Sequence, residues 1–68
     1  MNYNELSEEE QIEFVSECGY RIMNITEPTE SVQYAALRQY SMAIRYVKNP
    51  TNLIKTYATL INFDQEIL

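Results

Sequence analysis

The 68-residue sequence contains no histidine and no tryptophan, one cysteine, one glycine and two prolines. Without histidine, the chain lacks the side chain that most often serves as general base or metal ligand near neutral pH. A single cysteine cannot close a disulfide within the chain, so folding should not require an oxidising compartment. No apolar run approaches the ~20 residues that cross a bilayer, and the N-terminal residues lack the basic and apolar regions of a signal peptide. We therefore expect one cytoplasmic domain spanning residues 1–68, with no membrane partner.

Basic residues are also few, with 5 Lys and Arg against 10 Asp and Glu and a formal net charge of −5. Residues 1–30 contain eight glutamates and one arginine, whereas residues 31–68 contain four basic and two acidic residues. Direct binding of nucleic acid is not expected, because phosphate contacts require Lys and Arg. A protein with a basic surface is a better partner for the acidic half.

The sequence repeats itself weakly at an offset of 22 residues. Thr29-Glu30 and Gln33 repeat Ser7-Glu8 and Gln11, and Pro50-Thr51 repeats Pro28-Thr29. A third copy begins at Thr51 and fades before the end of the chain. The echo predicts repeat units at approximately residues 7–28, 29–50 and 51–68.

Each copy starts with a residue that favours a helix N-terminus. Ser7 and Glu10 have the spacing of a capping box, and Thr29 and Thr51 repeat the cap. The two prolines disfavour helix in the residues before them, so the preceding helices should end near Thr26 and Lys48. Helical spacing of apolar residues predicts first helices over 7–18, 29–40 and 51–62 and second helices near 20–26 and 42–48, with a stub at the C-terminus.

The fold predicted from these signals is all-α, a small stack of three helix–turn–helix units of which the third is incomplete. Gly19 is expected to mark the break between the two helices of the first unit. The side chains expected to face the core are Phe14, Val15, Cys18, Ile22, Ile25, Val32, Ala35, Ala36, Tyr40, Ala43, Ile44, Val47, Ile54, Tyr57, Ala58 and Ile61.

Residues 28–51 resemble one unit of a short helical repeat of unknown function that occurs in tandem in phage, viral and bacterial proteins. The matching positions are Val32, Gln33, Ala35, Ala36, Arg38, Gln39, Ala43, Ile44 and Val47. The resemblance is partial for residues 7–27 and faint for 52–68. It implies a helical-repeat architecture and often a phage or mobile-element source, and it implies no reaction and no catalytic residue.

Three glutamates, Glu9, Glu13 and Glu17, are four residues apart and should form one ridge on the first helix. Like charges at this spacing destabilise a helix by ~0.2–0.5 kcal/mol per pair, and no lysine on the same helix compensates them. The ridge either recognises a basic partner or is a solvated face that keeps the protein in solution. A metal site is disfavoured because carboxylates lined up along a helix do not converge.

Tyrosine is abundant, with six residues in 68. Tyr34 and Arg38 form an i,i+4 pair, and Arg45 and Tyr46 lie on the following predicted helix. Tyr and Arg are enriched at the energetic centres of protein interfaces, so these four residues are candidates for partner binding. Two other interpretations remain: tyrosines packed between repeats with their hydroxyls at the rim, and stacking on single-stranded nucleic acid.

Two further features complete the sequence-based expectations. Cys18 falls on the apolar stripe and lacks an activating histidine, so we expect a small core side chain rather than a nucleophile. The C-terminal residues Leu60, Ile61, Phe63, Ile67 and Leu68 are strongly apolar. They should either fold back over the third unit or dock on another chain.

From these observations we expect no enzyme, no cofactor and no metal, and a protein that acts by occupying a surface. The resemblance favours a phage-encoded inhibitor of a host protein, such as a defence or anti-CRISPR target. The alternative is a structural or assembly module, for instance a homodimer, that associates through its apolar C-terminal segment.

Overall fold

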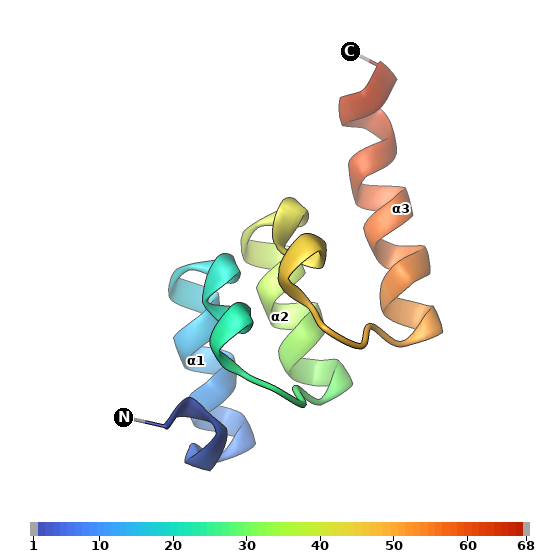
Figure 1. The fold of residues 1–68 in the computed structure, drawn as a ribbon. Coiled ribbons are helices and arrows are strands. Elements are labelled where there is room, and N and C mark those ends of the chain that lie inside the picture. Colours follow the sequence, from blue (N-terminus) through green and yellow to red (C-terminus); the bar gives the residue numbers. More distant parts are fainter. Residues whose placement is uncertain (1, 68) are drawn as a thin grey trace.

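The computed structural model describes residues 2–67, with side chains for residues 2–62. Within this range all regular structure is helical, so the all-α prediction is confirmed (Figure 1). The α-helices are α1 (Glu8–Glu17), α2 (Glu30–Gln39) and α3 (Asn52–Ile67), and the 3-10 helices are η1 (Tyr3–Glu5), η2 (Gly19–Asn24) and η3 (Ser41–Tyr46).

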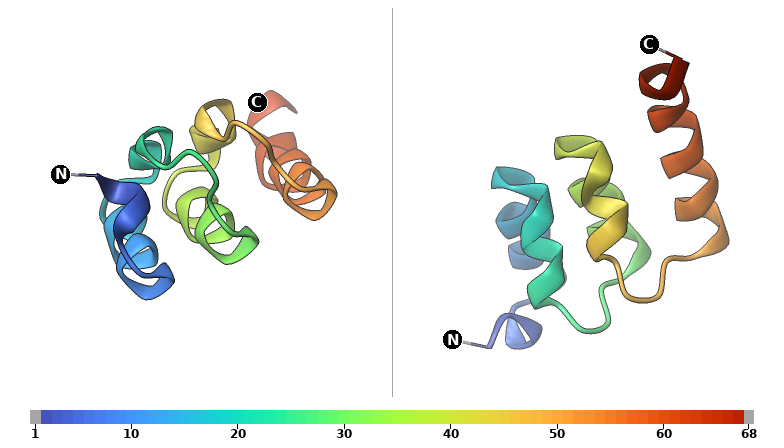
Figure 2. Two further views of the ribbon diagram at one scale, coloured as in Figure 1. Left: turned by 60° about the horizontal axis from the view of Figure 1, so that its bottom comes forward. Right: turned by 45° about the horizontal axis from the view of Figure 1, so that its top comes forward.

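The helices form two layers (Figure 2). One layer contains α1, α2 and α3 side by side, and the other contains η2 and η3. In the second layer η2 packs on α1 and α2, and η3 packs on α2 and α3. Each α-helix followed by a 3-10 helix is therefore one helix–turn–helix unit, and the 22-residue echo corresponds to the step between units.

All three α-helices begin at the positions that their capping residues predicted. The Ser7 hydroxyl accepts a hydrogen bond from the Glu10 amide (3.2 Å), and the Glu10 carboxylate accepts one from the Ser7 amide (3.0 Å). The hydroxyls of Thr29 and Thr51 accept from the amides three residues later, at 3.4 and 3.2 Å. These contacts satisfy amides that the first helical turn leaves without partners.

The second helices of the units are shorter than predicted and belong to the 3-10 type. They end at Asn24 and Tyr46, two residues before the expected positions, with extended backbone at Ile25 and Val47. These two side chains remain buried, so the chain inserts an apolar residue into the core before it turns toward each proline.

The core contains most of the residues that helical spacing selected, together with one that it missed. Leu37 is 1% exposed although the predicted stripe did not include it. Tyr40 was expected in the core and is 42% exposed, and Cys18 is half-buried where α1 ends. The largest fully enclosed side chains are Val15, Ile22, Ile25, Val32, Leu37 and Ile54.

Gly19 occupies the break between α1 and η2, as predicted, for a reason that the sequence does not show. Its φ is not positive, so the backbone conformation does not require glycine. A Cβ atom at this position would lie 2.5 Å from the carbonyl oxygen of Ala36 and 2.8 Å from the Cβ of Tyr40. Glycine is needed because α2 packs directly against the start of η2.

Two buried glutamines at equivalent positions hold neighbouring segments of the chain. The Gln33 amide nitrogen donates to the carbonyl oxygen of Pro28 (2.9 Å), and its amide oxygen accepts from the Thr51 amide (3.4 Å). The Gln11 amide nitrogen donates to the Tyr3 carbonyl oxygen (3.1 Å) and so ties η1 to α1. The third unit has the exposed Lys55 at this position.

Replacing Gln33 by alanine is expected to lower the free energy of unfolding by about 1–2 kcal/mol, because the half-buried Pro28 carbonyl and Thr51 amide lose their partner. Chemical denaturation followed by circular dichroism measures the change. Gln11→Ala is the comparison, since Gln11 makes one such bond, and its effect should be smaller. Equal effects of the two substitutions would show that the link to Thr51 contributes nothing.

Aromatic and basic side chains cover the N-terminal side of the first unit. Phe14 occupies the position of Ala36 in the second unit, and the Tyr3 ring stacks on it with 4.2 Å between ring centroids. The Arg21 guanidinium lies 5.0 Å from the same ring centroid and donates to the Phe14 carbonyl oxygen (3.2 Å). This cluster closes the apolar end of the first unit.

The third unit differs from its prediction because α3 runs without a break to Ile67, five residues past the expected end at 62. No separate C-terminal stub is formed within residues 52–67, and α3 extends beyond α1 and α2 (Figure 1). Thr59 is exposed where Val15 and Leu37 are buried, since no 3-10 helix covers α3 there. Leu60 is exposed and Ile61 half-buried, and the side chains of Phe63, Ile67 and Leu68 lie outside the described residues.

Candidate functional site

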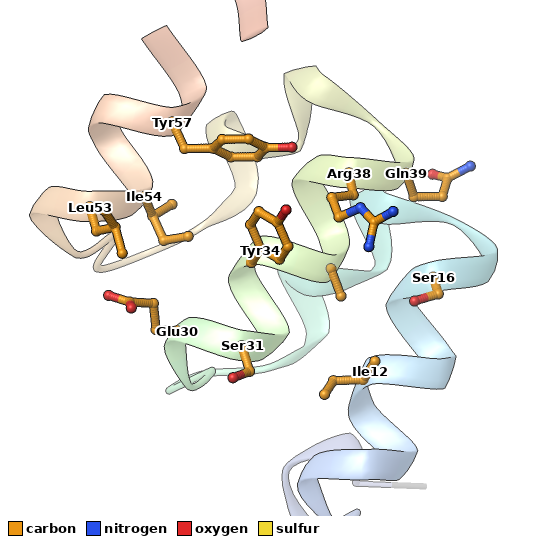
Figure 3. Close-up of a pocket in the computed structure, with 11 residues that line it drawn as sticks. Ile12, Ser16, Glu30, Ser31, Tyr34, Arg38, Gln39, Leu53, Ile54 and Tyr57 are labelled. Atoms are coloured by element: carbon orange, nitrogen blue, oxygen red, sulfur yellow. The ribbon is translucent and has the colours of Figure 1, made fainter. Parts of the chain in front are cut away.

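An open groove of about 810 Å³ crosses the outer face of the α-layer (Figure 3). All three α-helices contribute to it, with α2 in the middle. Its lining residues are Ile12, Ser16, Glu30, Ser31, Tyr34, Ala35, Arg38, Gln39, Leu53, Ile54 and Tyr57. We call this surface the groove face.

The 22-residue repeat explains which residues reach the groove face. Ser31, Tyr34 and Arg38 lie at spacings of three and four on α2, which places them on one side of the helix. The same register gives Glu9, Ile12 and Ser16 on α1 and Leu53 and Leu60 on α3. Among the lining residues, α1 therefore contributes Ile12 and Ser16, α2 contributes the charged side chains and Tyr34, and α3 contributes apolar and aromatic side chains.

Tyr34 is the centre of the groove face. Its ring centroid lies 4.9 Å from that of Tyr57, with 48° between the ring planes, so the two rings join α2 to α3. The Arg38 guanidinium lies 5.7 Å from the Tyr34 ring centroid, a cation–π distance. Tyr34 nevertheless remains 44% exposed, and its accessible ring area is available to another molecule.

The charges on α2 are separated along the helix and have no ionic partners. Glu30 lies in the first turn and Arg38 in the last. Within the described part of the chain the one ion pair joins Glu17 to Arg21 at 2.9 Å. Both α2 charges line the groove, so it is polarised from a negative to a positive end.

The three glutamates of the predicted acidic ridge have different surroundings in the structure. Glu9, Glu13 and Glu17 are all exposed on α1. Glu9 has the register of the groove face, whereas Glu13 is equivalent to Tyr57, which points toward the preceding helix, so Glu13 points away from α2. Glu17 pairs with Arg21 of η2, so a basic residue outside the helix compensates one charge of the ridge.

The predicted tyrosine and arginine residues lie on two different surfaces. Tyr34 and Arg38 are together on the groove face, whereas Arg45 and Tyr46 are exposed on η3, in the other layer. Tyr46 lies near Tyr20 of η2. A hydrogen bond with the Cys18 thiol is the main cause that raises the pKa of Tyr20, and Tyr46 adds a smaller rise. The four candidates therefore do not form one site.

The groove face includes residues that sequence analysis did not select, namely Ile12, Ser16, Glu30, Ser31 and Leu53, and the exposed Leu60 has the same register further along α3. Leu53 and Leu60 are 64% and 67% exposed, the largest exposed fractions among the described large apolar side chains. Applying the offset of 22 to Tyr34 and Arg38 would have identified the neighbouring positions on α1 and α3. The chemistry of the three positions differs, which is why a search for identical residues overlooked them.

Within the described residues, no cluster of three or more Asp, Glu or Cys side chains is arranged to hold a metal ion. Over the same range, no helix has the length and apolar character needed to span a membrane. Comparison with models of protein families, with characterised proteins and with solved structures gave no match.

Proposed function

We propose that the protein is a protein-binding module and that the groove face contacts its partner. The observation that carries this proposal is the cluster of Tyr34, Tyr57 and Arg38. Tyr and Arg dominate the energetic centres of protein interfaces, because they combine apolar area with directional polar groups. Here the two rings are held against each other by α2 and α3, so little side-chain entropy remains to be lost on binding.

The acidic side of α1 favours a partner with a basic surface. Glu9 and Glu13 are exposed on α1 and have no ionic partner among the described residues, so a basic surface could approach both. Complementary charge at the rim raises association rates and selects against acidic partners. Nucleic acid remains a disfavoured partner, since Arg38 is the single basic residue that lines the groove.

The biological form that we propose is a phage-encoded inhibitor that covers a functional surface of a host protein, with a host defence protein or anti-CRISPR target as the example. The resemblance of residues 28–51 to a repeat common in phage proteins supports this form. Such an inhibitor needs a binding face and no catalytic group, and it would act in the cytoplasm of the host cell.

The proposal is tested by affinity purification from host lysate with mass spectrometry. We expect the wild-type chain to retain a defined protein, and we expect Tyr34→Ala or the pair Glu9→Lys with Glu13→Lys to reduce retention at least tenfold. Glu5→Lys with Glu27→Lys is the matched control, because it makes the same change of net charge at two exposed glutamates outside α1. Loss of retention in the control as well would show that net charge, rather than the groove face, governs binding.

A second candidate function is a structural or assembly module that associates through its apolar C-terminal segment. The exposed Leu60 favours this alternative, since it extends the apolar side of α3 toward that segment. Concentration-dependent mass in light scattering that disappears in Phe63→Asp or Leu68→Asp would support assembly. Such behaviour together with intact host-protein binding would assign the two roles to different surfaces.

A further inference from the structure

One row of residues on α2 has a symmetry that the proposed function does not use. Glu30, Tyr34 and Arg38 are spaced by four residues and all line the groove (Figure 3). At 1.5 Å per residue the two charged positions are about 12 Å apart along the helix, with Tyr34 midway between them. From the start of α2 to its end, the row therefore has a negative side chain, an aromatic ring and a positive side chain.

This order makes the row complementary to a reversed copy of itself. If a second copy lies antiparallel, each Glu30 faces the opposite Arg38 and the two tyrosines meet in the middle. In a parallel arrangement each charge would face its own kind, and like charges in contact oppose association. Neither charge has an ionic partner within the described part of the chain, so both can form such pairs.

We propose that the groove face binds a second copy of this chain around a two-fold axis that passes beside Tyr34. The two α2 helices are antiparallel across this axis. Glu30 of each copy pairs with Arg38 of the other, as a two-fold interface requires. Rows of residues spaced by four pack together in the most common class of helix crossings, so the row has suitable geometry for a helix pair.

The apolar side of the groove face suits the same arrangement. Leu53 and Leu60 flank Tyr57 on α3 and are more than 60% exposed in the single chain. An antiparallel copy places the Leu53 end of one α3 toward the Leu60 end of the other. Their burial supplies apolar area, and the charge pairs fix the direction.

This inference does not depend on the proposed host partner. A dimer formed by the groove face exists in the purified protein without any other molecule, and a host protein that used the same face would have to separate the two copies. It also differs from assembly through the C-terminal segment, since it requires Glu30 and Arg38 and no residue beyond 62.

Charge reversal tests the dimer, with mass measured by sedimentation velocity over a range of concentrations. Wild-type protein should dimerise, and Glu30→Arg or Arg38→Glu alone should weaken association at least tenfold, because each variant places two pairs of like charges together. The double variant E30R/R38E should restore the wild-type dimer. An equimolar mixture of the two single variants should form a mixed dimer, since one chain then carries both positive charges and the other both negative charges.

The control is Arg45→Glu on η3, which makes the same charge change in the other layer and should leave the dimer unchanged. Recovery of association in the mixture excludes unfolding as the cause of the single-variant losses. A wild-type chain that stays monomeric at millimolar concentration and low salt would overturn the inference. A dimer that resists both charge reversals would also overturn it. If association were lost in Phe63→Asp instead, the contact would be assigned to the C-terminal segment.

Discussion

Leu37→Ala is expected to lower the free energy of unfolding by about 2–5 kcal/mol, the range for deleting a buried leucine side chain. Leu37 is 1% exposed and belongs to the central core between the two layers. A chain of this length has a total stability of roughly 3–10 kcal/mol, so the variant should be largely unfolded near body temperature. Thermal and urea unfolding followed by circular dichroism measure the loss.

Leu60→Ala is the matched control, because it deletes the same atoms from a leucine that is 67% exposed. Its effect on unfolding should stay within about 0.5 kcal/mol at dilute concentration, where association does not contribute. Similar losses for the two variants would contradict the two-layer core described here.

Gly19→Ala is expected to cost about 2–3 kcal/mol, the upper part of the range for overpacking. The added Cβ would meet the Ala36 carbonyl oxygen at 2.5 Å and the Tyr40 Cβ at 2.8 Å. Neither atom can retreat as the end of a flexible side chain does, since the Ala36 carbonyl already accepts the Tyr40 amide at 2.9 Å. A shift of η2 would also stretch the bond from the Gly19 amide to the Gln39 side chain (2.6 Å).

Ser41→Ala makes the appropriate comparison, because Ser41 begins η3 at the position equivalent to Gly19 and already carries a Cβ. We expect a smaller loss of stability there than at Gly19, measured by the same denaturation curves. If Gly19→Ala proved as stable as the wild type, the close approach of α2 to η2 would be wrong.

The sequence predicted the α-helices well because their starting signals are local. A hydroxyl residue, a glutamate three positions later and a preceding proline act within one turn, and each cap lies where it was expected. The ends of the second helices were harder to place, since a 3-10 turn and an α-turn share the same apolar spacing over six residues. The predicted end of the third α-helix at Asn62 was wrong, because no proline or glycine interrupts α3.

Leu37 shows how the repeat could have improved the predicted core. Val15, 22 residues earlier, was placed inside on helical spacing, yet the same position in the second copy was not carried over. The two side chains occupy equivalent places beneath the 3-10 layer and are both buried. Thr59, at the third such position, is exposed because no 3-10 helix follows to cover it.

The candidate site was only partly accessible to sequence reasoning. The contact between Tyr34 and Arg38 was predicted because both lie four apart on one helix. The contact of Tyr34 with Tyr57 depends on how α3 packs against α2, and no local signal contains that information. Arg45 and Tyr46 were grouped with them by nearness along the chain, but the turn at Tyr40 sends η3 into the other layer.

The amino-acid sequence by itself determined the helical class, the starting points of the α-helices, the 22-residue step and the acidity of the first unit. These properties follow from hydrogen bonds and charges within a few residues of one another. Only the tertiary structure decided that Gly19 must lack a side chain, that Gln33 holds two connections and that three α-helices share one groove. Those outcomes depend on distances between units, which arise when the apolar sides of the helices are buried against each other.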